Sequence, residues 1–178
     1  MEHYEMLENI RRHSLVVEKV ASLITHGLIE TGVPLSVKKV AAGALMHDIA
    51  KTICLRDGGD HAALGEYICL KNQLREIADL VGEHIRLKHF DPNGAILEKE
   101  IIYYADKRVN HDQIVTIEER LQDLFLRYGQ GNVALEKRME ENFLICKKVE
   151  QKLFASLPFG PNDIADLLDL SELVEQTD

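Results

Sequence analysis

Residues 41–53 place two polar, metal-binding side chains inside a segment that is otherwise apolar. The sequence of this stretch, AAGALMHDIAKTI, surrounds His47 and Asp48 with Ala, Leu, Met and Ile. Burying an imidazole and a carboxylate costs free energy unless each finds a polar partner. A divalent metal ion would satisfy both, because imidazole and carboxylate are ordinary ligands for such ions. Neighbouring residues of a helix point about 100° apart, so the pair indicates either one shared ion or a carboxylate that bridges to a second ion.

Apolar residues recur at helical spacing along most of the 178-residue chain. Turn and cap signals separate the helical stretches, among them an N-cap at Ser36, a glycine-rich loop at 56–60 and a turn cluster at 89–94. No pair of segments predicts a β-hairpin, and aromatic residues make up only 6% of the chain. The sequence therefore predicts an all-α bundle of roughly seven helices. The expected helices cover residues 4–30, 36–53, 61–70, 74–85, 95–105, 114–128 and 132–157, with a short last one at 164–170.

The charge of the chain limits what it can bind. With 21 Lys and Arg against 30 Asp and Glu, its formal net charge is −9. A strongly acidic surface argues against binding of nucleic acid polymers or anionic membranes, since that affinity comes from Lys and Arg. A small phosphorylated substrate is not excluded, because a metal ion and a few basic groups can reverse the local field.

The cellular location is predicted from cysteine usage and hydropathy. Cys54, Cys69 and Cys146 form an odd, scattered set without CxxC spacing, which favours reduced thiols over disulfides or a cysteine-based zinc site. The first residues contain no apolar core of a signal peptide, and no apolar run approaches the roughly 18 residues of a membrane-spanning helix. We expect a cytoplasmic protein.

Four further polar residues stand in helical contexts that do not explain them. They are His13 in RRHSLVV, His61 in DHAALGEYI, His84 in ADLVGEHI and Asp106 in IIYYADK. Each has an ordinary interpretation when taken alone: an exposed histidine, an N-cap pair, a charge at a helix C-terminus or a surface charge run. Together with the pair at 47–48, they put one or two metal ligands on each of five successive predicted helices. A helical bundle can direct such side chains to one point.

This pattern resembles the HD-domain metal-dependent phosphohydrolases of the HDIG-like type. Their H…HD…D signature is matched here by His13, by the pair His47 and Asp48, and by Asp106. The segment HSLVVEKVASLI is similar to the first-helix pattern of the family, and HDIAK is similar to its HDIGK variant, with Ala50 in place of glycine. The resemblance covers roughly residues 10–110 and implies an HD-domain helical bundle.

The resemblance also implies the metal ligands. The element HAALG, which begins at His61, and the residue His84 are similar to the extra histidines of the two-metal members. Two divalent ions are therefore expected, with iron or manganese preferred for a ligand set without thiolates and zinc, cobalt, nickel or magnesium as alternatives. A metal-bound water or hydroxide between the ions is the implied nucleophile. The implied ligands are His13, His47, Asp48 and Asp106 for one ion, and Asp48 as a bridge with His61 and His84 for the other.

Basic residues near this signature are candidates for substrate binding. Lys51 follows Asp48 by three residues and so lies on nearly the same face of the predicted helix. We assign catalytic roles to Asp48 and Lys51, the lysine as a contact to a substrate phosphate; a surface lysine that extends into solvent is the alternative. Further substrate-binding candidates are Lys107, Arg108 and Arg86. The histidines interpreted as surface or structural residues are His26, His89 and His111.

The resemblance implies a domain organisation and an activity. Residues 1–112 would form the HD phosphohydrolase core, and residues 113–178 a C-terminal helical extension packed on it. The extension matches no known pattern, and would either close over the site or form a dimer face. The expected function is hydrolysis of a phosphoester or pyrophosphate bond in a small phosphorylated metabolite, with a nucleotide as the expected substrate. A homodimer is an open alternative to a monomer.

Two other functions use the same scaffold. A non-catalytic nucleotide sensor would be expected to have lost ligands, whereas all the expected ligands and Lys51 are present. A di-iron oxygenase of the HD type keeps the metal site and changes the chemistry, and the sequence gives it little support. Among the hydrolases, the chain lacks the Gly-Tyr-Pro element of the cyclic-dinucleotide branch and the Glu-Asp pair of the guanosine-tetraphosphate branch. It is a neighbour of the dinucleoside-tetraphosphate branch, but has GEHIRLK where that branch has a His-Thr element.

Overall fold

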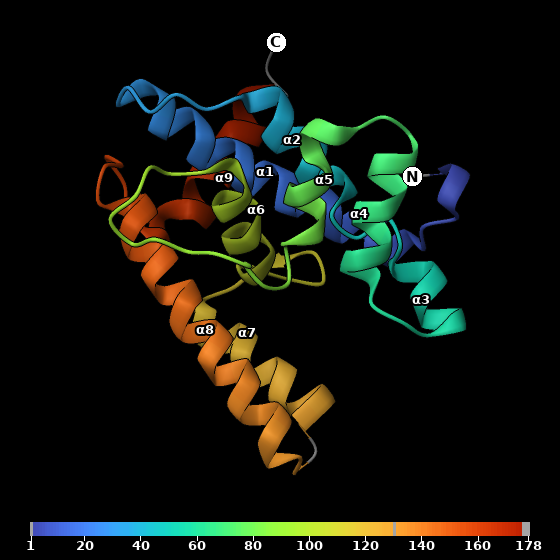
Figure 1. The fold of residues 1–178 in the computed structure, drawn as a ribbon. Helices are drawn as coiled ribbons and strands as arrows, with labels where there is room; N and C mark the ends of the chain where they lie inside the picture. Colours follow the sequence, from blue (N-terminus) through green and yellow to red (C-terminus); the bar gives the residue numbers. More distant parts are fainter. Residues whose placement is uncertain (1, 130, 176–178) are drawn as a thin grey trace.

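Helices account for nearly all of the regular structure in residues 2–129 and 131–175, the residues that the computed structural model describes (Figure 1). The predicted all-α bundle is confirmed. Within this described part, no helix combines the length and the apolar character needed to cross a lipid bilayer. The α-helices are α1 (Glu8–Glu30), α2 (Val37–Met46), α3 (Lys51–Asp57), α4 (His61–Lys71), α5 (Arg75–Gly82), α6 (Glu98–Lys107), α7 (Ile117–Leu124), α8 (Val133–Phe154) and α9 (Ile164–Glu175). Shorter turns are the 3₁₀ helices Glu2–Tyr4 and Pro161–Asp163 and the π-helix Phe125–Gly129.

The central helix of the bundle is α1. Its side chains Val17, Val20, Ile24 and Leu28 are fully buried and recur at helical spacing. This helix packs on α2, α6 and α9, while α2 also contacts α5 and α6, and α4 packs on α5. These contacts bring the first turns of α1 beside the C-terminal ends of α2, α5 and α6, where a cluster of polar side chains lies.

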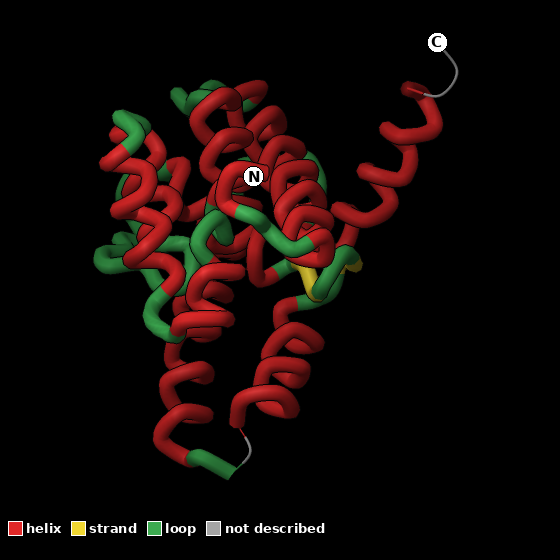
Figure 2. The backbone as a smooth tube through the Cα atoms, turned by 90° about the vertical axis from the view of Figure 1, so that its right-hand side faces the viewer, coloured by secondary structure: helices red, strands yellow, loops and turns green. Residues whose placement is uncertain are grey.

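The C-terminal helices share this core and also extend beyond it. Phe143 and Leu153 of α8 are buried in the same apolar cluster as the side chains of α1 and α6. The helix α7 and the first turns of α8 project from the bundle as a helical hairpin, which both views show (Figures 1 and 2). The division into units 1–112 and 113–178 stays a prediction, and residues 1 and 176–178 at its ends lie outside the described residues.

The helix expected over residues 36–53 is interrupted, so the prediction of one continuous helix is wrong. The helix α2 ends at Met46 and α3 begins at Lys51, which leaves His47 and Asp48 in a break of consecutive turns. Backbone bonds in the break span three residues, from Ile49 N to Met46 O at 3.0 Å and from Lys51 N to Asp48 O at 2.9 Å. The chain changes direction there, and the two polar side chains are therefore not restricted to the spacing of a regular helix.

A small β-hairpin follows α6, contrary to the prediction that the chain has none. The strand β1 (Val109–Asn110) pairs antiparallel with β2 (Gln113–Ile114). Its turn contains His111 with a φ of 56°, a left-handed conformation that glycine or asparagine adopts more readily. Strands of two residues are too short to show an alternation of apolar and polar side chains. A histidine at a turn position with positive φ, where glycine or asparagine is usual, also removes the sequence signal of a hairpin. The helix expected from residue 114 begins after this hairpin, at Ile117.

Two glycines allow the helices that carry the polar cluster to approach closely. A Cβ added to Gly43 of α2 would lie 2.6 Å from a side-chain carbon of Ile102 and 2.9 Å from one of Leu80. A Cβ added to Gly65 of α4 would lie 2.7 Å from a methyl carbon of Val81. All three separations are shorter than packed side chains tolerate, so a larger residue would force α2 and α4 away from their neighbours. Gly65 thus gives the HAALG element a packing role.

A buried ion pair joins α8 to α6. Lys152 Nζ lies 2.8 Å from both carboxylate oxygens of Glu100, and both side chains are almost fully buried. Replacing Lys152 with methionine is expected to lower the free energy of unfolding by about 3–5 kcal/mol, because it leaves the Glu100 carboxylate unpaired in the interior. Urea denaturation followed by circular dichroism measures this loss.

The matched control for this prediction is Lys147→Met on the same helix. Lys147 Nζ lies 2.7 Å from a carboxylate oxygen of Glu118, but both side chains are exposed. An exposed pair contributes little to stability, so this variant is expected to unfold at nearly the same urea concentration as the wild type. Equal losses in the two variants would contradict the importance of the buried pair.

Candidate metal centre

The carboxylate of Asp48 lies at the middle of the polar cluster. Its oxygen Oδ1 lies 3.1 Å from His61 Nε2 and 3.5 Å from His84 Nε2. Its other oxygen, Oδ2, lies 3.5 Å from His47 Nε2 and 2.7 Å from Lys51 Nζ. The Asp48 side chain is only 1% exposed. Four separate side chains therefore converge on one buried carboxylate.

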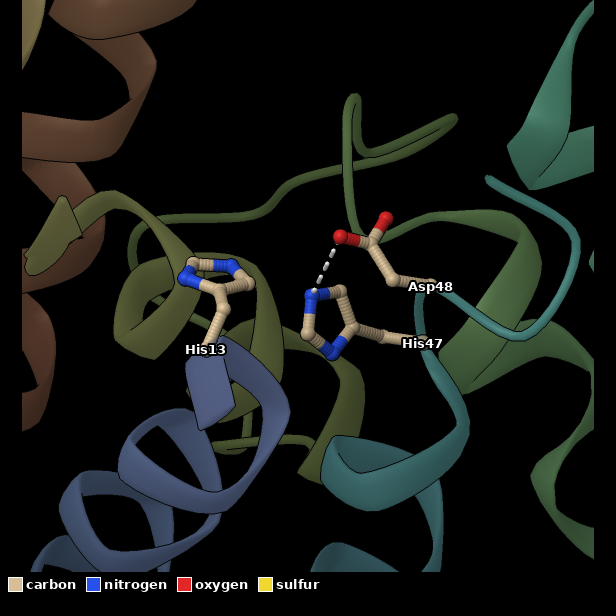
Figure 3. A group of neighbouring side chains, drawn as sticks. All are labelled: His13, His47 and Asp48. Carbon is tan, nitrogen blue, oxygen red and sulfur yellow. Dashed lines mark ion pairs between the residues drawn. The ribbon is translucent and has the colours of Figure 1, made fainter. Parts of the chain in front are cut away.

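His13 and Asp106 complete the cluster beside His47. His13 Nε2 lies 3.0 Å from Asp106 Oδ1, and His47 Nε2 lies 3.6 Å from the same oxygen. Figure 3 shows His13 extending from α1 toward His47 and Asp48, which come from the break between α2 and α3, and its dashed line marks the His47–Asp48 ion pair. The structure thus brings together all the residues that the resemblance implied as ligands; their role as metal ligands stays a prediction.

Three of the imidazoles are oriented by backbone carbonyls. A carbonyl oxygen only accepts hydrogen bonds, so each bonded Nδ1 carries a proton and each Nε2 is directed toward the carboxylates. The carbonyls belong to the main chain and are fixed by the fold, so the rings cannot turn away without losing a bond. The bonds run from His13 Nδ1 to His111 O at 2.9 Å, from His47 Nδ1 to Ala44 O at 2.7 Å and from His84 Nδ1 to Val81 O at 2.6 Å.

The two carboxylates are strongly stabilised in their charged forms. Burial by itself favours the neutral acid, but the neighbouring imidazoles, His47 foremost, outweigh it and hold the pKa of Asp48 well below its ordinary value. For Asp106, burial is likewise outweighed, here by the ammonium group of Lys107 and then by His13, so that its pKa is also well below the ordinary value. Both side chains are therefore anionic at neutral pH.

The two buried histidines beside Asp48 differ in their proton affinity. Burial lowers the pKa of His84 to about 4, so this ring is neutral at pH 7. Burial also opposes protonation of His47, but the charges of Asp48 and Asp106 outweigh it and raise the pKa of this ring above 6.5. A neutral His84 faces Asp48 Oδ1 with a lone pair, so two acceptors meet at 3.5 Å. A cation bound between the two atoms would make such an approach favourable.

Two buried atoms at the centre have no hydrogen-bond partner among the described residues, namely His47 Nε2 and Asp48 Oδ1. Orphaned polar atoms of this kind are costly, and both are of the types that ligate divalent ions. Ligand atoms within 4.8 Å of one another form two groups, one of His13, His47 and Asp48 and one of Asp48, His61 and His84. The residues present fit a divalent metal ion, and Asp48 is common to both groups.

Two cavities reach this centre. The larger cavity, of about 370 Å³, lies between the bundle and the hairpin of α7 and α8, and includes Asp48, His84 and Asp106 in its wall. The smaller cavity, of about 170 Å³, approaches from the side of α1 and includes His13. Lys51 and Asp48 line both cavities. A small molecule can therefore reach Asp48 and Lys51 together.

The predicted substrate-binding residues are placed differently from one another. Lys51, Arg86 and Lys107 line the larger cavity, and the Lys107 ammonium also donates to the carbonyl of His84 and to Asp106 Oδ2, the latter at 3.1 Å. Arg108 does not line it. Its buried guanidinium faces the C-terminal half of the chain, so we do not retain it as a substrate contact. The partners of Arg108 are the carbonyls of Val115 and Pro161, at 2.6 and 2.9 Å, the Tyr104 hydroxyl and the carboxylate of Glu150.

The C-terminal helices contribute a wall to the larger cavity; closure of this extension over the site was one of the two alternatives, but its residues were not predicted from the sequence. Leu135, Arg138, Met139, Asn142 and Phe143 of α8 all line it. Their spacing of three or four residues is that of one helix face, so the amphipathic pattern of the segment contained the signal. A second group in the wall comes from α7 and the π-helix, and consists of Arg120, Leu124 and Tyr128.

Comparison with known families agrees with this geometry. The family model of the HD domain matches residues 10–110, which is more than half of the chain and contains every expected ligand. Searches of curated proteins and of solved structures gave no match. The matched family, the helical fold and the cluster of histidines and aspartates all point the same way, and the chain belongs to the HD-domain family.

Proposed function

We propose that this protein is a metal-dependent phosphohydrolase that cleaves a phosphoester or pyrophosphate bond in a small phosphorylated metabolite, with a nucleotide as the expected substrate. The observation that carries the proposal is the pair of ligand groups that share Asp48 at the end of a cavity lined by basic side chains. Family membership supports it, because HD domains are typical of metal-dependent hydrolases.

The proposal gives each side chain of the centre a role. His13, His47, Asp48 and Asp106 would hold one divalent ion, and Asp48 would bridge to a second. When bound, ions at such a site lower the pKa of water and offset the charge of phosphoryl oxygens. The nitrogen and oxygen ligand set favours iron or manganese. The residues that would complete the second site are His61 and His84.

Lys51 is the residue we assign to the substrate phosphate. Burial opposes its charge, but Asp48 and then Asp106 outweigh this and raise the pKa of Lys51 above its ordinary value, so the ammonium persists at neutral pH. Its side chain is 32% exposed and lines both cavities. A fixed positive charge in a partly buried site orients a phosphoryl group and stabilises the charge that develops on it.

The remaining expectations concern the setting of the protein. The free cysteines Cys54, Cys69 and Cys146 suit a reducing cytoplasm, where we place the protein. The basic side chains gather at the cavity while the chain as a whole carries a charge of −9. This contrast suits a small anionic substrate rather than a nucleic acid polymer or a membrane surface.

Phosphate release from a panel of nucleotides, in the presence of manganese or iron, tests the proposal. His47→Ala is expected to lose bound metal and to reduce hydrolysis to background, because it removes a buried ligand that faces both carboxylates. The matched control is His26→Ala, since His26 is an exposed residue of α1 outside the cluster. Unchanged metal content and hydrolysis in His47→Ala would refute the proposal. Nucleotide binding without turnover in the metal-loaded wild type would point to a sensor instead.

A further inference from the structure

Two arginines in the wall of the larger cavity have no carboxylate partner in the part of the chain that the structure describes. Arg86 follows α5 and Arg138 lies on α8, and both are exposed. The Arg138 side chain donates to the carbonyl of Ala134 on its own helix at 3.3 Å. Acidic residues outnumber basic ones in this chain, 30 to 21, so most arginines could have found a carboxylate partner. Two arginines that line the cavity without one are therefore available to bind an anionic ligand.

A hydrogen bond joins the two segments that carry these arginines. Asn142 Nδ2 donates to the carbonyl of Ile85 at 3.0 Å, which fixes the backbone next to Arg86 against α8. The hydroxyl of Tyr103 donates to Asn142 O at 2.7 Å and to Asn142 Oδ1 at 3.0 Å. Arg138 precedes Asn142 by four residues and so lies one helical turn away on the same face. The hydrogen bond from Asn142 therefore places both arginines near the junction of α8 with the segment after α5, where both line the cavity.

The surface around the arginines is apolar. Leu135, Met139 and Phe143 alternate with Arg138 and Asn142 along the cavity face of α8. The π-helix and the end of α7 contribute Tyr128 and Leu124 to the same cavity. A cavity with basic groups at the metal centre, apolar walls and a further basic pair matches a molecule with two anionic groups joined by an apolar body.

We propose that Arg86 and Arg138 form a second anion-binding subsite, which selects phosphate esters whose apolar or aromatic body carries a second phosphate or similar anion. This inference rests on the proposed function, since the first anion is the phosphate that reacts at the metal centre. Guanidinium groups bind phosphate through paired, charge-assisted hydrogen bonds. The subsite thus makes the second charge of the substrate a requirement for tight binding.

Isothermal titration calorimetry with phosphonates tests the subsite without requiring turnover. Alkane α,ω-diphosphonates of two to eight carbons are compared with alkyl monophosphonates of the same length. At the best length, the wild type is expected to bind the diphosphonate about tenfold more tightly than the monophosphonate, since a charge-assisted contact contributes about that much. The double variant Arg86→Gln/Arg138→Gln is expected to bring the two affinities to within about twofold of each other.

The control is a second double variant with the same loss of charge, Lys71→Gln/Lys137→Gln. Both lysines are exposed and lie outside the cavity wall, so this variant is expected to keep the preference for the diphosphonate. A preference that survives in the arginine variant, or is absent from the wild type at every length, overturns the subsite. Failure of the proposed function is seen separately, as absence of phosphate release from the nucleotide panel with a normal calorimetric preference.

Discussion

Replacing Asp48 with alanine is expected to abolish metal binding at both of the proposed sites. Asp48 belongs to both groups of ligand atoms, and its two carboxylate oxygens face different histidines. Without the carboxylate, His61 and His84 keep no carboxylate between them, His13 and His47 keep only that of Asp106, and both expected sites lose the negative charge that they share. Plasma mass spectrometry on protein purified without chelator is expected to find one ion for each ligand group in the wild type and background levels in Asp48→Ala.

A control variant and two alternative outcomes determine how the measured metal content is interpreted. Asp57→Ala removes an exposed carboxylate that pairs with Arg56 and is expected to keep the metal content of the wild type. One ion per chain in the wild type would reduce His61 and His84 from ligands to substrate contacts. Wild-type metal content in Asp48→Ala would contradict the bridged centre altogether.

Replacing Lys51 with alanine is expected to lower kcat/KM by about 10²–10³-fold, with the metal content unchanged. The ammonium group is the basic group nearest to Asp48, at 2.7 Å, and it lines both cavities. Its loss removes the fixed positive charge that we assign to the substrate phosphate, while every expected metal ligand remains. Steady-state kinetics on the best nucleotide, together with metal analysis of the same samples, measure both quantities.

Two further variants separate this role from a general effect of charge. Lys71→Ala removes an exposed lysine of α4 and is expected to retain wild-type kinetics. Lys51→Arg keeps the charge and is expected to recover part of the lost rate, although the guanidinium differs in shape from the ammonium. Wild-type kinetics in Lys51→Ala would mean that Lys51 is a surface residue without a role in the reaction. Loss of metal in the same variant would mean that Lys51 supports Asp48 rather than the substrate.

The fold was predictable where local patterns determine it and unpredictable where they do not. Helical periodicity and cap residues indicated most of the helices, and the N-cap at Ser36 is present, with its Oγ accepting from Lys39 N at 3.3 Å. The break at His47 and Asp48 contains no Gly or Pro, so no local sequence signal predicted the interruption of the helix. The hairpin turn at His111 likewise adopts a positive φ without a glycine. In both places tertiary contacts, rather than propensity, determine the backbone.

The candidate site, like the fold, was predictable from the sequence only in part. Polar residues in apolar segments, and their resemblance to a family pattern, were enough to name the residues that the structure brings together around Asp48. The partners of Arg108 could not be predicted from local sequence, because Glu150 and Pro161 lie more than forty residues further along the chain. The backbone carbonyl that orients His13 comes from His111, which the sequence suggested to be a surface or structural residue.

The walls of the larger cavity come from two different stretches of sequence. The expected ligands lie within residues 10–110, which match the HD family, whereas Leu135, Arg138 and Met139 lie beyond that match. Mutations in the projecting hairpin can therefore alter recognition while the metal ligands remain as they are. An ancestor with this centre could acquire new substrates by divergence of one peripheral segment, and grafting that hairpin onto another member of the family is a direct route to transferring selectivity.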